Sequence, residues 1–196
     1  MYREYGGLVK KPSNEAKIWK YMDIARLISI LDREELYFTS TDEFVDPYEG
    51  TLAEYNKIDT VRLERFRHEL EDVDDDMIKR LILRPPNFQN YRDRLVVNCW
   101  HLNDGESAAM WDLYSNRKAG IAIQSTYRRL RDSFSKAIES VGIGMVNYMD
   151  YNTQWMKEDF ILPFLTKRTS FKHEQELRAF TIIYDNDLSR DEIPKN

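Results

Sequence analysis

Hydrophobic positions follow the period of an α-helix in two segments of the chain. Over residues 24–31 they recur at intervals of three and four, and Asp23, a favourable N-cap residue, stands directly before them. Residues 127–141 carry a second stripe of this kind, which starts at Tyr127. Both segments are therefore predicted to be helices, and the stripe of the second is that of an amphipathic helix.

Other segments are rich in β-branched and aromatic residues and end at polar or turn-forming positions, which is typical of strands. The run at 95–101 is the most continuously apolar of them and is predicted to be a central strand. The other predicted strands are residues 18–22, 35–40, 120–124, 144–151 and 174–184. Further helices are predicted at 107–114, at 155–165 and within 51–83, where the acidic run 72–76 divides two of them.

Strands and helices alternate at uneven spacing, which favours an α+β fold over a doubly wound parallel sheet. We therefore expect a single domain over residues 1–184, with a mixed or antiparallel central sheet and flanking helices. Residues 185–196 are predicted to be a polar, frayed C-terminal tail. With 196 residues, the chain can bury roughly 70% of the surface that its unfolded form exposes, so its core needs no metal or disulfide.

Charge and cysteine content narrow the class of protein. The 34 acidic and 29 basic residues give a net charge of −5, which argues against a protein that coats nucleic acid in general. The single cysteine, Cys99, lies in an apolar run and is interpreted as a reduced, buried thiol. We recognise no secretory signal and no apolar run long enough to span a membrane, so a cytoplasmic location is expected.

The motif Glu174-Gln175-Glu176 carries the strongest candidate chemistry. In a strand, Glu174, Glu176 and Arg178 would project from one face, together with Lys172. A carboxylate there could stabilise an oxocarbenium-like centre at a ribose, and the arginine could bind a phosphate or hold a carboxylate. Two structural alternatives stay open: a solvent-facing strand with paired charges, or a helix in which Glu174 and Arg178 form an i,i+4 pair.

Side chains near the ends of the first two predicted strands are further candidates. Tyr21 and Tyr37 could stack on a nicotinamide or a base, and Ser40 could bond a ribose hydroxyl, although strand aromatics are otherwise core residues. The segment 46–49, Asp-Pro-Tyr-Glu, has the composition of a capping box and is interpreted as the start of the following helix. The three histidines are scattered, so no metal site is predicted.

Four parts of the chain carry a resemblance: residues 18–21 with 35–40, 44–49, 110–115 with 120–123, and 167–178. In this order and spacing they resemble the bacterial family catalogued as domain of unknown function 2971, over nearly the whole chain. There are two departures from the family pattern. Val45 stands where members usually have Asn, and members tend to continue past the last strand with another apolar segment.

An aromatic first strand, a Ser/Thr-tipped second strand and a late Glu-x-Glu motif are also similar to NAD-dependent ADP-ribosyltransferases, although in the arginine-modifying type the Ser/Thr strand comes later. This resemblance implies a nucleotide-dependent transferase, with NAD as the candidate cofactor. Glu176 would be its catalytic carboxylate, and Glu174 the orienting or acceptor-side partner. The ligand contacts would be Tyr21, Tyr37, Ser40 and Arg178.

The alternative class is a non-catalytic binding or regulatory domain in a bacterial stress or phage-response system. Such a domain would use the groove between the helix that carries Trp111 and the last predicted strand. Whether the chain is an enzyme is therefore left open by the sequence.

Overall fold

The computed structural model describes residues 1–58, 60–61, 64–65, 68, 91–114 and 120–183. These residues form an α+β fold around a six-stranded sheet in which every strand pair is antiparallel. The predicted fold class is therefore confirmed. The strands are β1 (Lys17–Asp23), β2 (Thr39–Ser40), β3 (Leu95–Leu102), β4 (Gly120–Thr126), β5 (Gly142–Met145) and β8 (Glu176–Ile182).

The sheet has the order β4-β1-β3-β8-β5, so the predicted central strand β3 lies in its middle. β8 pairs with β3 along almost its full length, from Leu95 opposite Ile182 to His101 opposite Glu176. β1 and the short β2 lie on the other side of β3, where β1 pairs near Leu102 and β2 near Val96.

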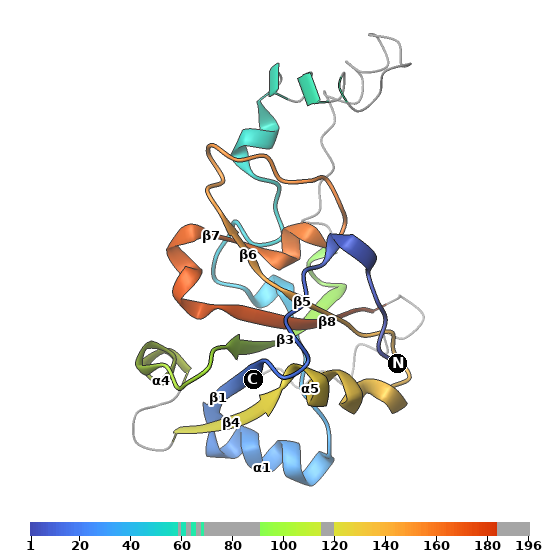
Figure 1. Ribbon diagram of the computed structural model, residues 1–196, viewed down its shortest axis with the longest axis vertical. Coiled ribbons are helices and arrows are strands. Elements are labelled where there is room, and N and C mark those ends of the chain that lie inside the picture. Colours follow the sequence, from blue (N-terminus) through green and yellow to red (C-terminus); the bar gives the residue numbers. More distant parts are fainter. Residues whose placement is uncertain (59, 62–63, 66–67, 69–90, 115–119, 184–196) are drawn as a thin grey trace.

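Two apolar clusters pack on the sheet. One includes Ile18, Trp100 and Leu177 together with side chains of α5 (Tyr127–Ser133). The other includes Val97, Phe180 and residues of the segments that lead to and from a small parallel pair, β6 (Asn147–Met149) and β7 (Thr166–Arg168). Figure 1 shows this pair and its loops above the six-stranded sheet, with α1 (Ile24–Arg33) at the opposite side of the molecule.

Several predicted elements are confirmed. Asp23 caps α1 as expected, because its Oδ1 accepts a hydrogen bond from the Arg26 amide at 2.8 Å. The helix predicted at 107–114 is α4 (Ala108–Tyr114). The predicted strands at 18–22, 95–101 and 120–124 are β1, β3 and β4.

Other predicted boundaries are wrong for identifiable reasons. The helix expected at 127–141 ends at Ser133 and continues only as the 3-10 helix η5 (Phe134–Lys136). The strand expected at 35–40 is reduced to β2, because Leu36 and Phe38 pack onto the α5 cluster instead of continuing a ladder. The strand expected at 144–151 is divided into β5 and β6, which belong to different sheets.

The helix expected at 155–165 is also wrong. The described chain there is irregular until the 3-10 helix η6 (Leu162–Leu165), which contains Pro163 in its first turn. Of the expected helical region 51–83, residues 54–57 form the 3-10 helix η3 (Glu54–Lys57), and 60–61, 64–65 and 68 are helical. The rest of that region, the acidic run 72–76 included, lies outside the described residues, as does the predicted tail 185–196.

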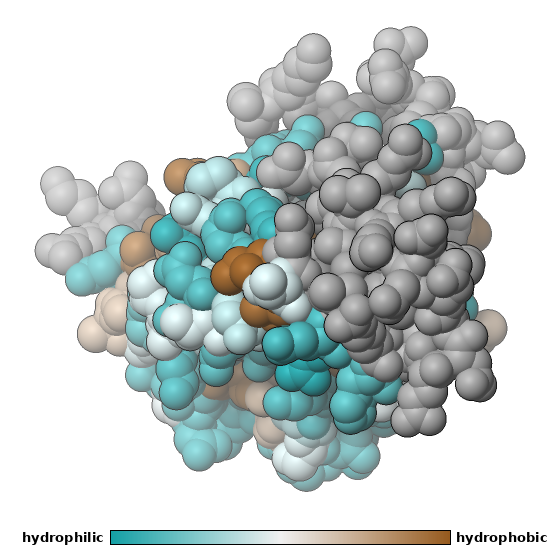
Figure 2. Space-filling model, turned by 90° about the horizontal axis from the view of Figure 1, so that it is seen from above, coloured by the Kyte–Doolittle hydropathy of each residue, from teal (hydrophilic) through white to brown (hydrophobic). Residues whose placement is uncertain are grey.

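The face seen in Figure 2, which looks down on the molecule from above, is mostly hydrophilic over the described residues. A small hydrophobic patch lies near the middle of this face, and a few further hydrophobic residues appear at its margins. No helix in the described part of the chain is long and apolar enough to cross a membrane.

Candidate functional site

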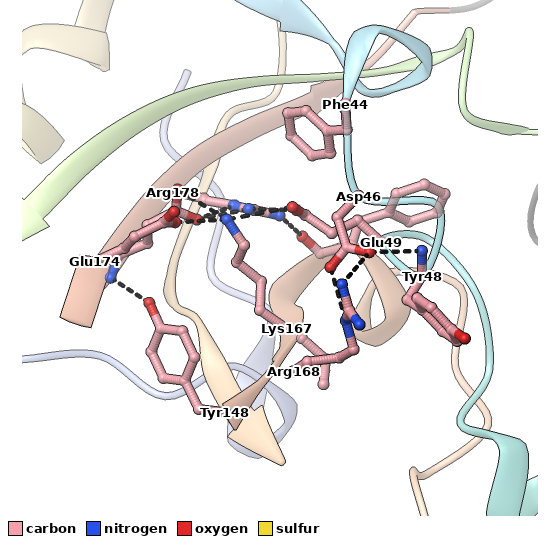
Figure 3. A network of polar contacts seen from close by, with 12 residues as sticks. Phe44, Asp46, Tyr48, Glu49, Tyr148, Lys167, Arg168, Glu174 and Arg178 are labelled. Atoms are coloured by element: carbon pink, nitrogen blue, oxygen red, sulfur yellow. Dashed lines mark hydrogen bonds and ion pairs between the residues drawn. The ribbon is translucent and has the colours of Figure 1, made fainter. Parts of the chain in front are cut away.

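Arg178 is the centre of a buried cluster of charged side chains on one face of the sheet. Its side chain projects from β8 and is 1% exposed (Figure 3). Its Nε donates to Glu176 Oε2 at 2.7 Å, and its Nη2 donates to Glu49 Oε2 at 2.6 Å. The remaining nitrogen, Nη1, donates to the Phe164 carbonyl at 2.6 Å, so the whole guanidinium is engaged.

Lys167 is the second buried cation of the cluster. Its Nζ lies 2.5 Å from Glu174 Oε2, 3.2 Å from Glu49 Oε1 and 3.7 Å from Glu176 Oε1. We call these five residues the buried charge cluster: Glu49, Lys167, Glu174, Glu176 and Arg178. It holds three carboxyl groups against two cations, all with side chains at most 7% exposed.

The pKa values of Glu174 and Glu176, the two candidate carboxyl groups from the sequence, shift in opposite directions. Burial and the neighbouring charge of Glu176 raise the pKa of Glu174 above its ordinary value. Burial also acts to raise the pKa of Glu176, but Arg178 and Lys167 outweigh it and hold that pKa below its ordinary value. Glu176 is therefore the stably ionised member of the pair, and Glu174 is the member that takes up a proton first.

Glu174 does not lie on the strand, which corrects the expected common face. It ends the 3-10 helix η7 (Thr169–Glu174), and Gln175 then adopts a left-handed backbone with φ 40° before β8 begins at Glu176. Lys172 is part of the same helix. The shared face of Glu176 and Arg178 is confirmed, whereas Glu174 reaches the cluster from a different element.

The turn at 46–49 joins the buried charge cluster to a neighbouring pocket. Lys167 points into the cluster, and the next residue, Arg168, meets Asp46: Nε lies 3.1 Å from Oδ2, and Nη2 lies 3.0 Å from Oδ1. The guanidinium of Arg168 also lies over the ring of Tyr48 at 4.5 Å from its centroid (Figure 3). Planar, two-point pairing of this kind fixes the orientation of an arginine.

The interpretation of 46–49 as a helix cap is wrong. Asp46 Oδ1 accepts from the Tyr48 amide at 3.1 Å, but residues 47–50 form a turn and no α-helix follows directly. The side chain of Glu49 belongs to Arg178 and Lys167 instead of a helix N-terminus. Gly50 ends the turn with φ +77° and donates its N–H to the Pro163 carbonyl at 3.0 Å.

A pocket of about 480 Å³ opens beside Arg168. Tyr48 and Tyr151 supply aromatic surface to it, and their rings meet edge to face with centroids 6.0 Å apart. The exposed residues of its lining carry a carboxylate, an amide and two hydroxyl groups. The full lining consists of Tyr48, Met149, Asp150, Tyr151, Asn152, Arg168, Thr169 and Ser170.

The other predicted ligand contacts do not join this site. Ser40 pairs with Val96 on β3, whereas Glu176 pairs with His101, and five residues of strand span about 17 Å. The Ser40 hydroxyl donates instead to the Arg92 carbonyl at 3.3 Å. Tyr37 is 59% exposed, and its carbonyl accepts a hydrogen bond from Asn98.

Tyr21 lies closer to the cluster but is buried beneath α4. Its ring meets that of Trp111 edge to face at 5.1 Å, and its hydroxyl accepts from the Ser107 amide at 2.8 Å. On its other side, the ring of Tyr21 lies 6.1 Å from His101, whose Nδ1 is 2.7 Å from the Glu174 carbonyl. Tyr21 thus fills space between α4 and the sheet, and its hydroxyl is already bonded.

Sequence reasoning missed four charged residues of the site: Asp46, Glu49, Lys167 and Arg168. Asp46 and Glu49 belong to the second of the four segments that carry the family resemblance, and Lys167 and Arg168 to the fourth. Ion pairs join these two segments in space, and the contact of Tyr21 with Trp111 joins the first to the third. The segments that contain these four residues could be recognised in the sequence, but which segments contact each other depends on the fold.

Among the described residues, no group of three or more His, Cys, Asp or Glu side chains is arranged to hold a metal ion. The carboxyl groups of the buried charge cluster surround cations instead.

Comparison of the chain with protein-family models, with curated proteins and with solved structures gave no match. The resemblances to domain of unknown function 2971 and to ADP-ribosyltransferases therefore stay predictions from the sequence, and the function has to be argued from the site.

Proposed function

We propose that this chain is a nucleotide-binding domain and that its ligand occupies the pocket beside Arg168. The observation that carries the proposal is the fixed position of the Arg168 guanidinium at the pocket, between the Asp46 carboxylate and the Tyr48 ring. An oriented guanidinium beside the half-exposed ring of Tyr48 matches the phosphate and the base of a nucleotide.

The remaining lining supports the same ligand class. The carboxylate of Asp150 can accept hydrogen bonds from ribose hydroxyls, and Asn152 and Ser170 can donate to or accept from a base or a phosphate. Asp46 and Asp150 offset the positive charge of Arg168, so a nucleotide with few phosphates suits the pocket better than a polyphosphate. ADP-ribose and NAD belong to this class.

Binding is better supported than catalysis by Glu176. Glu176 is 6% exposed, and its carboxylate is held by Arg178 at 2.7 Å and approached by Lys167 at 3.7 Å. A carboxylate that stabilises a developing ribosyl cation must face that cation, and it cannot do so while its oxygens are paired with permanent cations of the protein. The contacts of Glu176 therefore favour a binding domain over a transferase.

Transferase activity is the second candidate, on one specific observation. Glu174 and Glu176 are adjacent carboxyl groups whose pKa values are shifted in opposite directions. Pairs of this kind separate the acid and base roles in many active sites. Release of nicotinamide from NAD by the wild type, lost in Glu176→Gln, would support the transferase.

Calorimetric titration with ADP-ribose and with a non-hydrolysable NAD analogue tests the binding proposal. The double variant Asn152→Ala/Ser170→Ala removes two exposed pocket side chains and should weaken binding by at least about tenfold, since each hydrogen bond contributes roughly 1 kcal/mol. The matched control, Asn14→Ala/Ser135→Ala, removes exposed side chains of the same types elsewhere and should bind like the wild type. Equal affinities of both double variants would reject the pocket.

A further inference from the structure

One edge of the six-stranded sheet is covered by the chain itself, and the other is open among the described residues. At the β5 edge, the N-terminal segment supplies backbone hydrogen bonds: Arg3 N donates to Val141 O at 2.8 Å, and Met145 N donates to Lys10 O at 2.8 Å. At the opposite edge, β4 pairs only with β1 within the part of the chain that the structure describes.

The open edge has none of the usual protection against strand pairing. Edge strands commonly carry charged residues, proline or a bulge that prevents another strand from adding to them. β4 reads Gly-Ile-Ala-Ile-Gln-Ser-Thr and pairs in unbroken register from Gly120 opposite Asp23 to Thr126 opposite Lys17. It is therefore a regular, uncharged seven-residue strand whose second side has no strand partner among the described residues.

An exposed apolar stripe lies next to this edge. Ile24, Ile28 and Leu31 of α1 are 52%, 59% and 68% exposed, whereas Leu27 and Ile30 at the flank of this stripe are half-buried. α1 contacts both β1 and β4, and Figure 1 shows it beside β4 at the lower margin of the sheet. The helix that carries the stripe therefore lies close to the strand edge.

We propose that the surface made by the strand edge and the helix stripe is the interface of a two-fold symmetric homodimer, in which β4 pairs antiparallel with β4 of a second copy. A two-fold axis makes a strand edge complementary to itself, because each copy offers the N–H and C=O groups that the other needs. The same axis sets α1 antiparallel to α1 of the second copy and buries both apolar stripes. Asp23, at one end of α1, then lies toward Arg33 of the second copy.

The size of the surface agrees with this occupant. Each copy contributes the outer backbone edge of the seven-residue β4 and the three exposed apolar side chains of α1, which places the interface at the small end of the range for specific dimers. A membrane would bury the stripe of α1 but leave the polar backbone edge of β4 unpaired in an apolar environment, which is costly. A second copy satisfies both features at once.

Sedimentation velocity of the full chain, over about 1 to 200 µM, tests the proposal, because interfaces of this size bind across the micromolar range and below. The wild type should form a dimer, and Ile28→Glu should shift the monomer–dimer midpoint upward by at least tenfold. Ile138→Glu, at an isoleucine that is 98% exposed outside this surface, is the matched control and should leave the midpoint unchanged. Circular dichroism of each variant checks that it is folded.

Hydrogen exchange supplies a second measurement on the unmodified protein. In the dimer, the outward amides of residues 120–126 become bonded, so their exchange should slow as the protein concentration rises. A wild type that stays monomeric at the highest concentration overturns the proposal. Binding of this monomer to lipid vesicles would then favour a membrane as the partner of the α1 stripe. A dimer without concentration-dependent protection of 120–126 overturns it as well.

Discussion

Arg178 donates from Nη2 to Glu49 Oε2 at 2.6 Å, and this contact joins β8 to a turn 129 residues earlier in the chain. The same guanidinium holds Glu176 on its own strand, so one buried cation orients two carboxylates from distant segments. Asp46, in the same turn as Glu49, accepts hydrogen bonds from a second arginine, Arg168. The turn at 46–49 is therefore fixed at two points, and the pocket beside it has a defined wall.

The first prediction concerns the stability that Arg178 provides. Arg178→Leu leaves Glu49 and Glu176 buried without their main partner, and we expect the free energy of unfolding to fall by about 3–5 kcal/mol. Urea denaturation measures this loss. The control Arg128→Leu removes an arginine whose side chain is 53% exposed in a pair with Glu15, and it should change stability by less than about 1 kcal/mol.

The second prediction concerns the pH dependence that Glu176 contributes. Its folded pKa lies below the ordinary value of 4.5, so the ionised group stabilises the folded state above that pH. This contribution is lost as the pH falls from 4.5 through the lowered folded pKa. In Glu176→Gln this part of the acid-induced loss of stability should be absent, as measured by urea unfolding at a series of pH values.

Glu174 should act in the opposite direction. Its folded pKa is raised above 4.5, so the folded state holds a proton that the unfolded state has already released, and stability falls as the pH rises through that interval. The same unfolding series on Glu174→Gln should lack this decline. A decline that persists unchanged in the variant would mean that another group titrates there.

The third prediction concerns the backbone of the turn. Gly50 has φ +77°, and a Cβ added there would lie 2.6 Å from Cε1 of the buried Phe164 ring. Gly50→Ala should therefore cost at least about 1–2 kcal/mol, from the left-handed backbone together with the clash. Gly105→Ala meets no atom within 4 Å and serves as the control in thermal unfolding, where its midpoint should stay close to that of the wild type.

The fourth prediction concerns the single thiol. Cys99 is half-buried, not fully buried as the sequence predicted. Desolvation, and then the negative charge of Glu176, raise its pKa to about 12, so little thiolate exists near neutral pH. Native protein should react with an aromatic disulfide reagent far more slowly than protein in denaturant. Fast, complete labelling of the native protein at pH 7 would contradict the raised pKa and reopen a role for Cys99 as a nucleophile.

The pattern of apolar residues was sufficient to predict the type and the bounds of elements in which that pattern is uniform from end to end. α1, β3 and β4 have such patterns, and each was predicted close to its observed bounds. The helix predicted at 155–165 is wrong because Met156, Ile161 and Phe164 belong to an irregular segment that is buried by tertiary packing. The spacing of these apolar residues resembles that of a helix only by coincidence. Burial alone cannot tell these two cases apart.

The candidate site was predictable only in part. Glu176 and Arg178 share a strand, so their contact follows from the two-residue period. Lysine and glutamate are usually exposed to solvent, so Lys167 and Glu49 would not be expected in the interior. Their burial is explained only by the folded arrangement, which places three carboxyl groups around one amine. Pairings between segments more than a hundred residues apart leave no signal in the spacing of a single sequence.

The most direct test of the central claim is to observe the pocket itself during ligand binding. Met149 lines the pocket, so in protein labelled at its methionine methyl groups we expect the Met149 resonance, identified with Met149→Leu, to shift saturably with ADP-ribose. The resonance of Met22, buried in β1, should stay in place. No shift of Met149 at millimolar ligand, or a saturable shift of Met22 without one at Met149, would contradict nucleotide binding beside Arg168.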